Sequence, residues 1–230
     1  MAIKDNLFLI AFLITAFLLV SVLFIGRILD ESRAKKLDDQ VRQLYKEFND
    51  FQTFFLMEQT YGDDMACLAF ESKLKEMDTS IWKIGQKIDQ YRAATEQFRK
   101  DVYYTEQKTI FNENEVLYLL LLKSLKAKCG FKQEIILFFY RNSDDCKKCD
   151  DQSFVLTDIN KDIDPEIAVF SFDMDLNITK TGLLSQFYKT KSLPCIVINE
   201  TTYCGIRDKN FIVNKLCETQ PLISICSKNK

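Results

Sequence analysis

The feature that most constrains the fold is an uncharged run of twenty residues, from Leu7 to Gly26, which reads LFLIAFLITAFLLVSVLFIG. A helix of that length crosses a bilayer core of about 30 Å. A cleaved signal peptide is the alternative. However, the run exceeds a usual signal core and ends at Ile25-Gly26-Arg27 without a small-x-small cleavage pattern. We therefore predict a retained transmembrane anchor over residues 1–27.

Two features bear on the orientation of this anchor, and they disagree. Positive charge is denser on its C-terminal side, which favours a cytoplasmic C-terminal part; the cations there are Arg27, Arg33, Lys35 and Lys36, against Lys4 on the other side. The eight cysteines favour the opposite orientation, because disulfides persist outside the cytosol. We give the cysteines more weight and predict a single-pass membrane protein with an extracytoplasmic C-terminal domain.

The composition excludes several classes of function. The 31 Lys and Arg residues nearly balance the 33 Asp and Glu residues, so there is no basic excess to hold nucleic acid. The chain has no histidine, which removes imidazole bases, Ser-His and Cys-His dyads and every His-ligated metal site. Thiol chemistry is what remains.

Residues 28–130 are predicted to form a helical hairpin of coiled-coil type. Apolar residues recur at alternating spacings of three and four in two runs, which is typical of helices packed along a narrow seam. Tyr61-Gly62-Asp63-Asp64 separates the runs and suits a reversal. We predict an antiparallel helical hairpin that serves as a spacer, or as a surface for a partner or for self-association. The runs are Ala34, Leu37, Val41, Leu44, Phe48, Phe51 and Phe55, then Cys67, Phe70, Leu74, Met77, Ile81, Ile84, Ile88, Tyr91, Phe98 and Val102.

A third helix is predicted to begin after Asn112 and to end at Gly130, which suits the C′ position. Its apolar run covers most of its circumference, so it should be buried between the hairpin and the domain that follows. Gly85 lies off the seam of the second run and is expected only to weaken its helix, by roughly 1 kcal/mol.

From Glu134 onward the pattern changes to short strands that alternate with helices. Strands are predicted at 134–140 and 167–172, each followed by a helix, the second over 177–188 with Leu183, Leu184 and Phe187 on one face. Two β runs flank Asn199-Glu200 and predict a hairpin in which Cys195 faces Cys204. Asp208 caps a final helix. The order is β-α-β-α-β-β-α, an α/β domain over residues 131–230.

The central motif is Cys146-Lys147-Lys148-Cys149, which follows the first strand and opens a helix. With Phe172-Asp173-Met174-Asp175 after the second strand and Ser192-Leu193-Pro194 before the hairpin, it resembles the thioredoxin superfamily over residues 134–218. The resemblance implies a cis-proline that faces the dithiol; an ordinary trans proline is the alternative. The chain departs from the family pattern at Asp145, in place of an aromatic residue, and at Tyr140, about where thioredoxins carry a buried acid.

The resemblance implies that Cys146 is the exposed nucleophile and Cys149 the resolving thiol. The residues support this independently, because a thiolate at a helix N-terminus is stabilised by unpaired N–H groups and by the helix dipole. Leu193 and Pro194 would bind an extended substrate. Two alternatives stay open: a purely structural disulfide, or a zinc site in which Cys195 and Cys204 supply two further thiolates.

Six cysteines lie outside the central motif, and their spacing suggests three pairs. Cys67 and Cys129 would join the helical hairpin to the third helix, and Cys217 and Cys226 would fasten the C-terminal tail to the last helix. Cys195 and Cys204 would be cross-strand neighbours that form a disulfide, or else accessory thiols beside the active pair.

The function predicted from the sequence is a membrane-anchored thiol–disulfide oxidoreductase that acts on protein disulfides and dithiols. It would need no metal and no cofactor besides its own redox-active disulfide. The alternative is a membrane-tethered interaction or scaffold protein, in which the helical hairpin is the working part and the thioredoxin-like domain is redox-inactive.

Overall fold

The computed structural model describes residues 2–64, 67, 81–91, 101–141, 146–163 and 166–228. The predicted pairing of the first two helices as an antiparallel hairpin depends on residues 68–80 and 92–100, which lie outside the described residues. Within the second run, residues 81–91 are helical.

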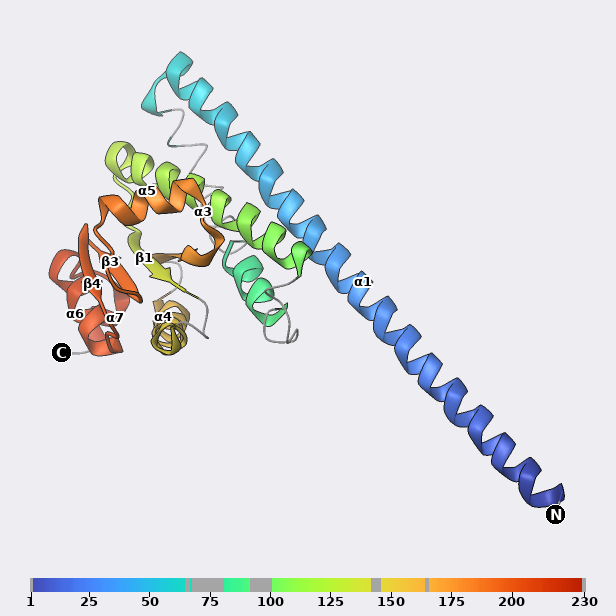
Figure 1. The fold of residues 1–230 in the computed structure, drawn as a ribbon. Coiled ribbons are helices and arrows are strands. Elements are labelled where there is room, and N and C mark those ends of the chain that lie inside the picture. The colour runs from blue at the N-terminus through green and yellow to red at the C-terminus, as the bar shows by residue number, and fades with distance from the viewer. Residues whose placement is uncertain are drawn as a thin grey trace.

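The chain begins with one long helix, α1 (Ala2–Tyr61). This helix continues without interruption past residue 27, where the predicted anchor ends. Its window Phe12–Leu29 has a mean hydropathy of 2.5, is not buried against the rest of the protein and is long enough to cross a membrane. Further along α1, Val41 is buried where the helix meets the rest of the protein. Figure 1 shows α1 extending well beyond the compact C-terminal part.

The third helix, α3 (Val102–Cys129), starts earlier than predicted. Asp101 is its N-cap, and the Asp101 side chain accepts a hydrogen bond from the Tyr104 N–H at 3.2 Å. Asn112 therefore lies inside the helix and not before it. The predicted end is confirmed, because Gly130 adopts the left-handed conformation with φ of 65°.

A mixed sheet of four strands forms the centre of the C-terminal part, in the order β2-β1-β3-β4. Strand β1 (Glu134–Tyr140) pairs in parallel with β2 (Ile167–Asp173) and antiparallel with β3 (Cys195–Ile198), which pairs antiparallel with β4 (Thr201–Cys204). The hairpin register is the predicted one, with Cys195 opposite Cys204 and Ile198 opposite Thr201.

Helices cover both faces of the sheet. One face packs against α4 (Lys147–Ile163) and α6 (Lys209–Thr219), and the other against α3 and α5 (Thr179–Phe187). A short 3₁₀ turn, η2 (Met174–Leu176), follows β2. Asp208 caps α6 as predicted, but α6 is not the final helix, because α7 (Ser224–Lys228) follows it. In α5, Leu184 packs on the core, whereas Leu183 and Phe187 are exposed.

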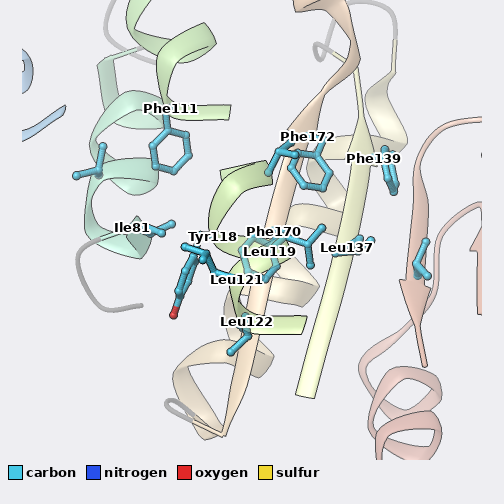
Figure 2. Close-up of a cluster of buried hydrophobic side chains, with 14 of the residues drawn as sticks. Ile81, Phe111, Tyr118, Leu119, Leu121, Leu122, Leu137, Phe139, Phe170 and Phe172 are labelled. Carbon is cyan, nitrogen blue, oxygen red and sulfur yellow. The ribbon is translucent and has the colours of Figure 1, made fainter. Parts of the chain in front are cut away.

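The larger hydrophobic core lies between α3 and the sheet. Figure 2 shows aromatic and aliphatic side chains of α3 gathered against Phe170 and Phe172 of β2 and Leu137 and Phe139 of β1. On its other side α3 packs against the helix at 81–91, so the helix is buried between two layers, as its apolar sequence predicts. Gly85 belongs to that interface: a Cβ there would lie 3.2 Å from Phe111 Cζ, so the expectation of a merely weakened helix was wrong.

Polar side chains of α3 close the outer edge of the sheet at β2. The Ser171 N–H donates to Glu115 Oε1 at 3.0 Å, and the Asp173 N–H donates to Asn112 Oδ1 at 2.9 Å. Asn112 Nδ2 in turn donates to Glu115 Oε2 at 3.0 Å and to the Ser171 carbonyl at 3.4 Å. Because an edge strand presents unpaired backbone groups, these two side chains take the place of a neighbouring strand.

Candidate functional site

The central cysteine pair lies where β1 ends and α4 begins. Cys146 and Cys149 form a disulfide with a Cα separation of 5.3 Å, and the Cys149 N–H donates to the Cys146 carbonyl at 2.9 Å. This local turn follows from the sequence, since two residues between the cysteines bring them to the same side of the first helical turn. The preceding residues 142–145, which include Asp145, lie outside the described part of the chain.

The two sulfurs differ in their surroundings. Cys146 is 9% exposed and Cys149 is 1% exposed, so Cys146 is the one nearer to solvent. The Arg141 backbone N–H points to Cys149 Sγ at 3.5 Å. Lys147 and Lys148 are exposed at the N-terminal end of α4, where their charge adds to the positive end of the helix dipole. The helix end and the two lysines favour a thiolate there, whereas Asp150 in the same turn opposes it.

The proline loop reaches the same end of the sheet. In the antiparallel register Phe139 pairs with Cys195, so Pro194 lies beside the end of β1, from which the chain continues to Cys146. The Leu193–Pro194 peptide bond is cis, as the resemblance implied. Leu193 packs against the hydrophobic cluster that contains both Cys146 and Cys149. The register and this packing place the proline loop and the cysteine pair at the same end of the sheet.

A buried charged group that the sequence did not indicate lies at this end of the sheet. Lys108 of α3 is 3% exposed, approaches Asp89 Oδ1 at 3.5 Å and lies 5.6 Å from the centre of the Tyr140 ring. Burial alone would lower the pKa of Lys108, but Asp89, Tyr140, Tyr104 and Asp173 outweigh it and raise that pKa. For Tyr140 burial acts in the other direction and raises the pKa well above its ordinary value, so Tyr140 stays neutral. No local pattern marks Lys108, because its partners come from distant segments.

The remaining six cysteines lie in three further disulfides. Cys67 pairs with Cys129, Cys195 with Cys204, and Cys217 with Cys226. All eight cysteines lie in the described part of the chain, and none of them is free. The structural roles of the outer pairs stay predictions. Among the described residues, no three Cys, Asp or Glu side chains are grouped so as to hold a metal ion.

The chain is similar to several solved structures, of which two are described below. No family model matches the chain, and no curated protein matches it. One structure, described as that of a malarial protein, is 22% identical over 38% of this chain and 98% of its own, with a TM-score of 0.31. The second, thioredoxin-2, described as a component of the malaria parasite protein secretion machinery, is 23% identical over 37% of this chain and 82% of its own, with a TM-score of 0.31. The similarity reaches less than two fifths of this chain.

Proposed function

We propose that the chain is a membrane-anchored thiol–disulfide oxidoreductase, with Cys146 and Cys149 as its redox-active dithiol. The observation that carries this proposal is the Cys146–Cys149 disulfide at the start of α4, with the more exposed sulfur on Cys146. The β-α-β-α-β-β-α order and the cis-proline beside the end of β1 support a thioredoxin-like domain. Within such a domain we expect the pair to exchange disulfides rather than only to cross-link the chain.

The reaction would proceed through a mixed disulfide. The Cys146 thiolate attacks one sulfur of a substrate disulfide; the new S–S bond forms as the substrate bond breaks, and the released substrate thiolate takes a proton. Cys149 then loses its proton and attacks Cys146 Sγ, which frees the second substrate thiol. The substrate has gained two electrons and two protons, and the Cys146–Cys149 disulfide has formed; the reverse sequence oxidises a substrate dithiol. The chemistry needs no cofactor.

Nearby positive charge would stabilise the thiolates that form in these reaction steps. The Cys149 thiolate would accept the Arg141 N–H that already points to its sulfur, and the Cys146 thiolate would lie at the N-terminal end of α4. Leu193 and Pro194 would hold an extended substrate segment, because their loop lies at the end of the sheet that carries the disulfide. Substrates in this proposal are protein disulfides and dithiols.

The test of turnover uses the full chain in detergent micelles. With a disulfide-linked fluorogenic peptide as substrate and dithiothreitol as electron donor, we expect the chain to accelerate peptide reduction in proportion to its concentration. The micelles alone are the control. Acceleration no greater than that of the micelles would contradict the proposal and favour the alternative, a tethered scaffold with a redox-inactive domain.

We further propose that α1 crosses the membrane once, with the C-terminal domain outside the cytosol. The apolar window Phe12–Leu29 supports the crossing, and the four disulfides support the orientation, because the cytosol keeps thiols reduced. In sealed membrane vesicles with the cytosolic face outward, an added protease should leave the C-terminal domain intact and digest it only after detergent. Digestion of the domain in the sealed vesicles would reverse the orientation.

A further inference from the structure

The Cys195–Cys204 disulfide lies at the wall of a surface hollow. This hollow, of about 710 Å³, is formed by the end of α5, the loop that leads to Pro194, and strand β4. Its lining includes Phe187, Lys189, Lys191, Ser192, Thr202 and Cys204. Of the two sulfur-bearing residues, Cys204 is partly exposed, whereas Cys195 is completely buried. An incoming thiol can therefore reach Cys204 and not Cys195.

This disulfide also differs from the other three in its backbone geometry. Cys195 and Cys204 are directly opposite each other in adjacent antiparallel strands, and their Cα atoms are 4.0 Å apart. The corresponding separations in the other pairs are 5.3 Å and 5.7 Å. Most disulfides have Cα separations of about 4.4 to 6.8 Å, and bonds outside this range are more reducible. Strained disulfides are typically the labile ones.

The hollow is lined by two lysines and one acidic residue, Glu200, whose carboxylate is paired with Lys123 at 2.6 Å. Lys189 and Lys191 are exposed on its rim, and each would stabilise a thiolate approaching Cys204. Phe187 beside them is 71% exposed and offers an apolar contact to the segment that carries the thiol. Strand β4 is at the end of the strand order, where an extended segment can lie along it.

We infer that Cys195–Cys204 is a second thiol–disulfide exchange site, which takes a protein dithiol presented on an extended, acidic segment. The partner's thiolate attacks Cys204 Sγ; the Cys195–Cys204 bond breaks, and Cys195 leaves as a thiolate that takes a proton. The partner's second thiol loses its proton and attacks the mixed disulfide, which releases Cys204 as a thiolate that is then protonated. The partner dithiol becomes a disulfide, and the Cys195–Cys204 pair becomes two thiols.

Two sets of hydrogen bonds connect the chain after Cys204 to elements near the central pair. The Gly205 N–H, directly after Cys204, donates to the Pro194 carbonyl at 2.8 Å. Two residues further on, the Arg207 N–H donates to Gln152 Oε1 of α4 at 2.7 Å, and Gln152 Nε2 donates to the Arg207 carbonyl at 3.2 Å. The strand end that carries Cys204 is thus hydrogen-bonded to both the proline loop and the helix of Cys146.

The test uses glutathione as the probe on the full chain in detergent micelles. Acid quenching, alkylation and peptide mass spectrometry then measure how fast each of the four disulfides opens. We expect Cys195–Cys204 to open at least about tenfold faster than Cys217–Cys226 and Cys67–Cys129, with glutathione trapped on Cys204. Opening no faster than those two, or glutathione trapped mainly on Cys195, would overturn the inference.

A charge-reversed variant tests the role of the hollow. In Lys189→Glu/Lys191→Glu, opening of Cys195–Cys204 by glutathione should slow by about three- to tenfold at low salt, and opening by dithiothreitol should slow less, because its attacking monothiolate carries less negative charge. Lys161→Glu, an exposed lysine on α4, is the matched control and should change neither rate. Equal slowing with both reductants, or no slowing, would contradict a thiol approach through this hollow.

A third comparison separates this site from the proposed catalytic pair. In Cys146→Ser/Cys149→Ser, Cys195–Cys204 should still open at the wild-type rate, because the inference does not depend on turnover at Cys146. If opening required Cys146, the second site would be only an internal relay and the inference would fail. Failure of peptide turnover with normal opening of Cys195–Cys204 would reject the proposed function alone.

Discussion

Cys149→Ser in the full chain is expected to accumulate a covalent complex with a disulfide substrate through Cys146, while Cys146→Ser loses peptide reduction by on the order of 10³-fold or more. In the first variant the mixed disulfide forms but has no neighbouring thiolate to resolve it. In the second, the attacking sulfur is gone, and Cys149, at 1% exposure, is too buried to replace it. Non-reducing electrophoresis and peptide mapping measure the complex, and the fluorogenic peptide measures the rate.

The matched control replaces two other cysteines with serine. Cys217→Ser/Cys226→Ser removes a disulfide between α6 and α7 and leaves the start of α4 intact, so it should keep most of the activity at temperatures where it is folded. Comparable losses in the control and in Cys146→Ser would show that the cysteines matter for stability only. A complex that forms on Cys149 would reverse the assigned roles.

The second large effect concerns stability and comes from Glu115. Burial raises the pKa of Glu115 to about 8, although the Ser171 N–H and Lys108 act to lower it. An ordinary glutamic acid with a pKa of 4.5 ionises in the unfolded chain, while Glu115 stays protonated in the folded chain up to about pH 8. The contribution of Glu115 to the free energy of unfolding is therefore complete below pH 4.5 and is lost as the pH rises through 8. From pH 5.5 to 8, the free energy of unfolding should fall by on the order of 3 kcal/mol.

The chain is well suited to this measurement, because it has no histidine to titrate in the same range. Its one tryptophan, Trp82, lines the same small cavity as Glu115, so urea unfolding can be followed by its fluorescence. In Glu115→Gln the slope between pH 5.5 and 8 should disappear. The variant should also lose about 1 kcal/mol at pH 5.5, since an amide nitrogen cannot accept from Asn112 Nδ2. A wild-type slope in the variant would assign the pH dependence to other groups.

The parts of the fold that local sequence determines were predictable. The two-residue turn Asn199-Glu200 sets which residues of β3 and β4 face each other, and both turn residues have positive φ, as tight hairpins require. Gly130 and Asp208 act through their own backbone or nearest neighbours, so their capping roles could also be inferred. Strand β1 and helix α4, which lie on either side of Cys146, were predictable for the same reason.

The parts that depend on distant partners were not predictable. Asn112 resembles a helix boundary in the sequence, because asparagine favours caps and loops, yet its partner Asp173 is 61 residues away. Lys108 is similar: its surroundings at Asp89 and Tyr140 come from other segments. Gly85 meets Phe111 of the next helix, a contact that the spacing of apolar residues does not encode. In each case tertiary packing overrides the local preference.

In the membrane-anchored protein that we propose, the unbroken helix α1 limits how far from the bilayer the C-terminal domain can work. Val41 is buried against α3, and it follows the end of the apolar window at Leu29 by twelve residues of continuous helix. At 1.5 Å per residue this segment measures about 18 Å along its axis. A flexible linker of the same length would allow many distances between the domain and the bilayer, whereas a helix fixes that distance. The enzyme that we propose would therefore have a short reach, selecting disulfides at the membrane surface over those of freely diffusing proteins.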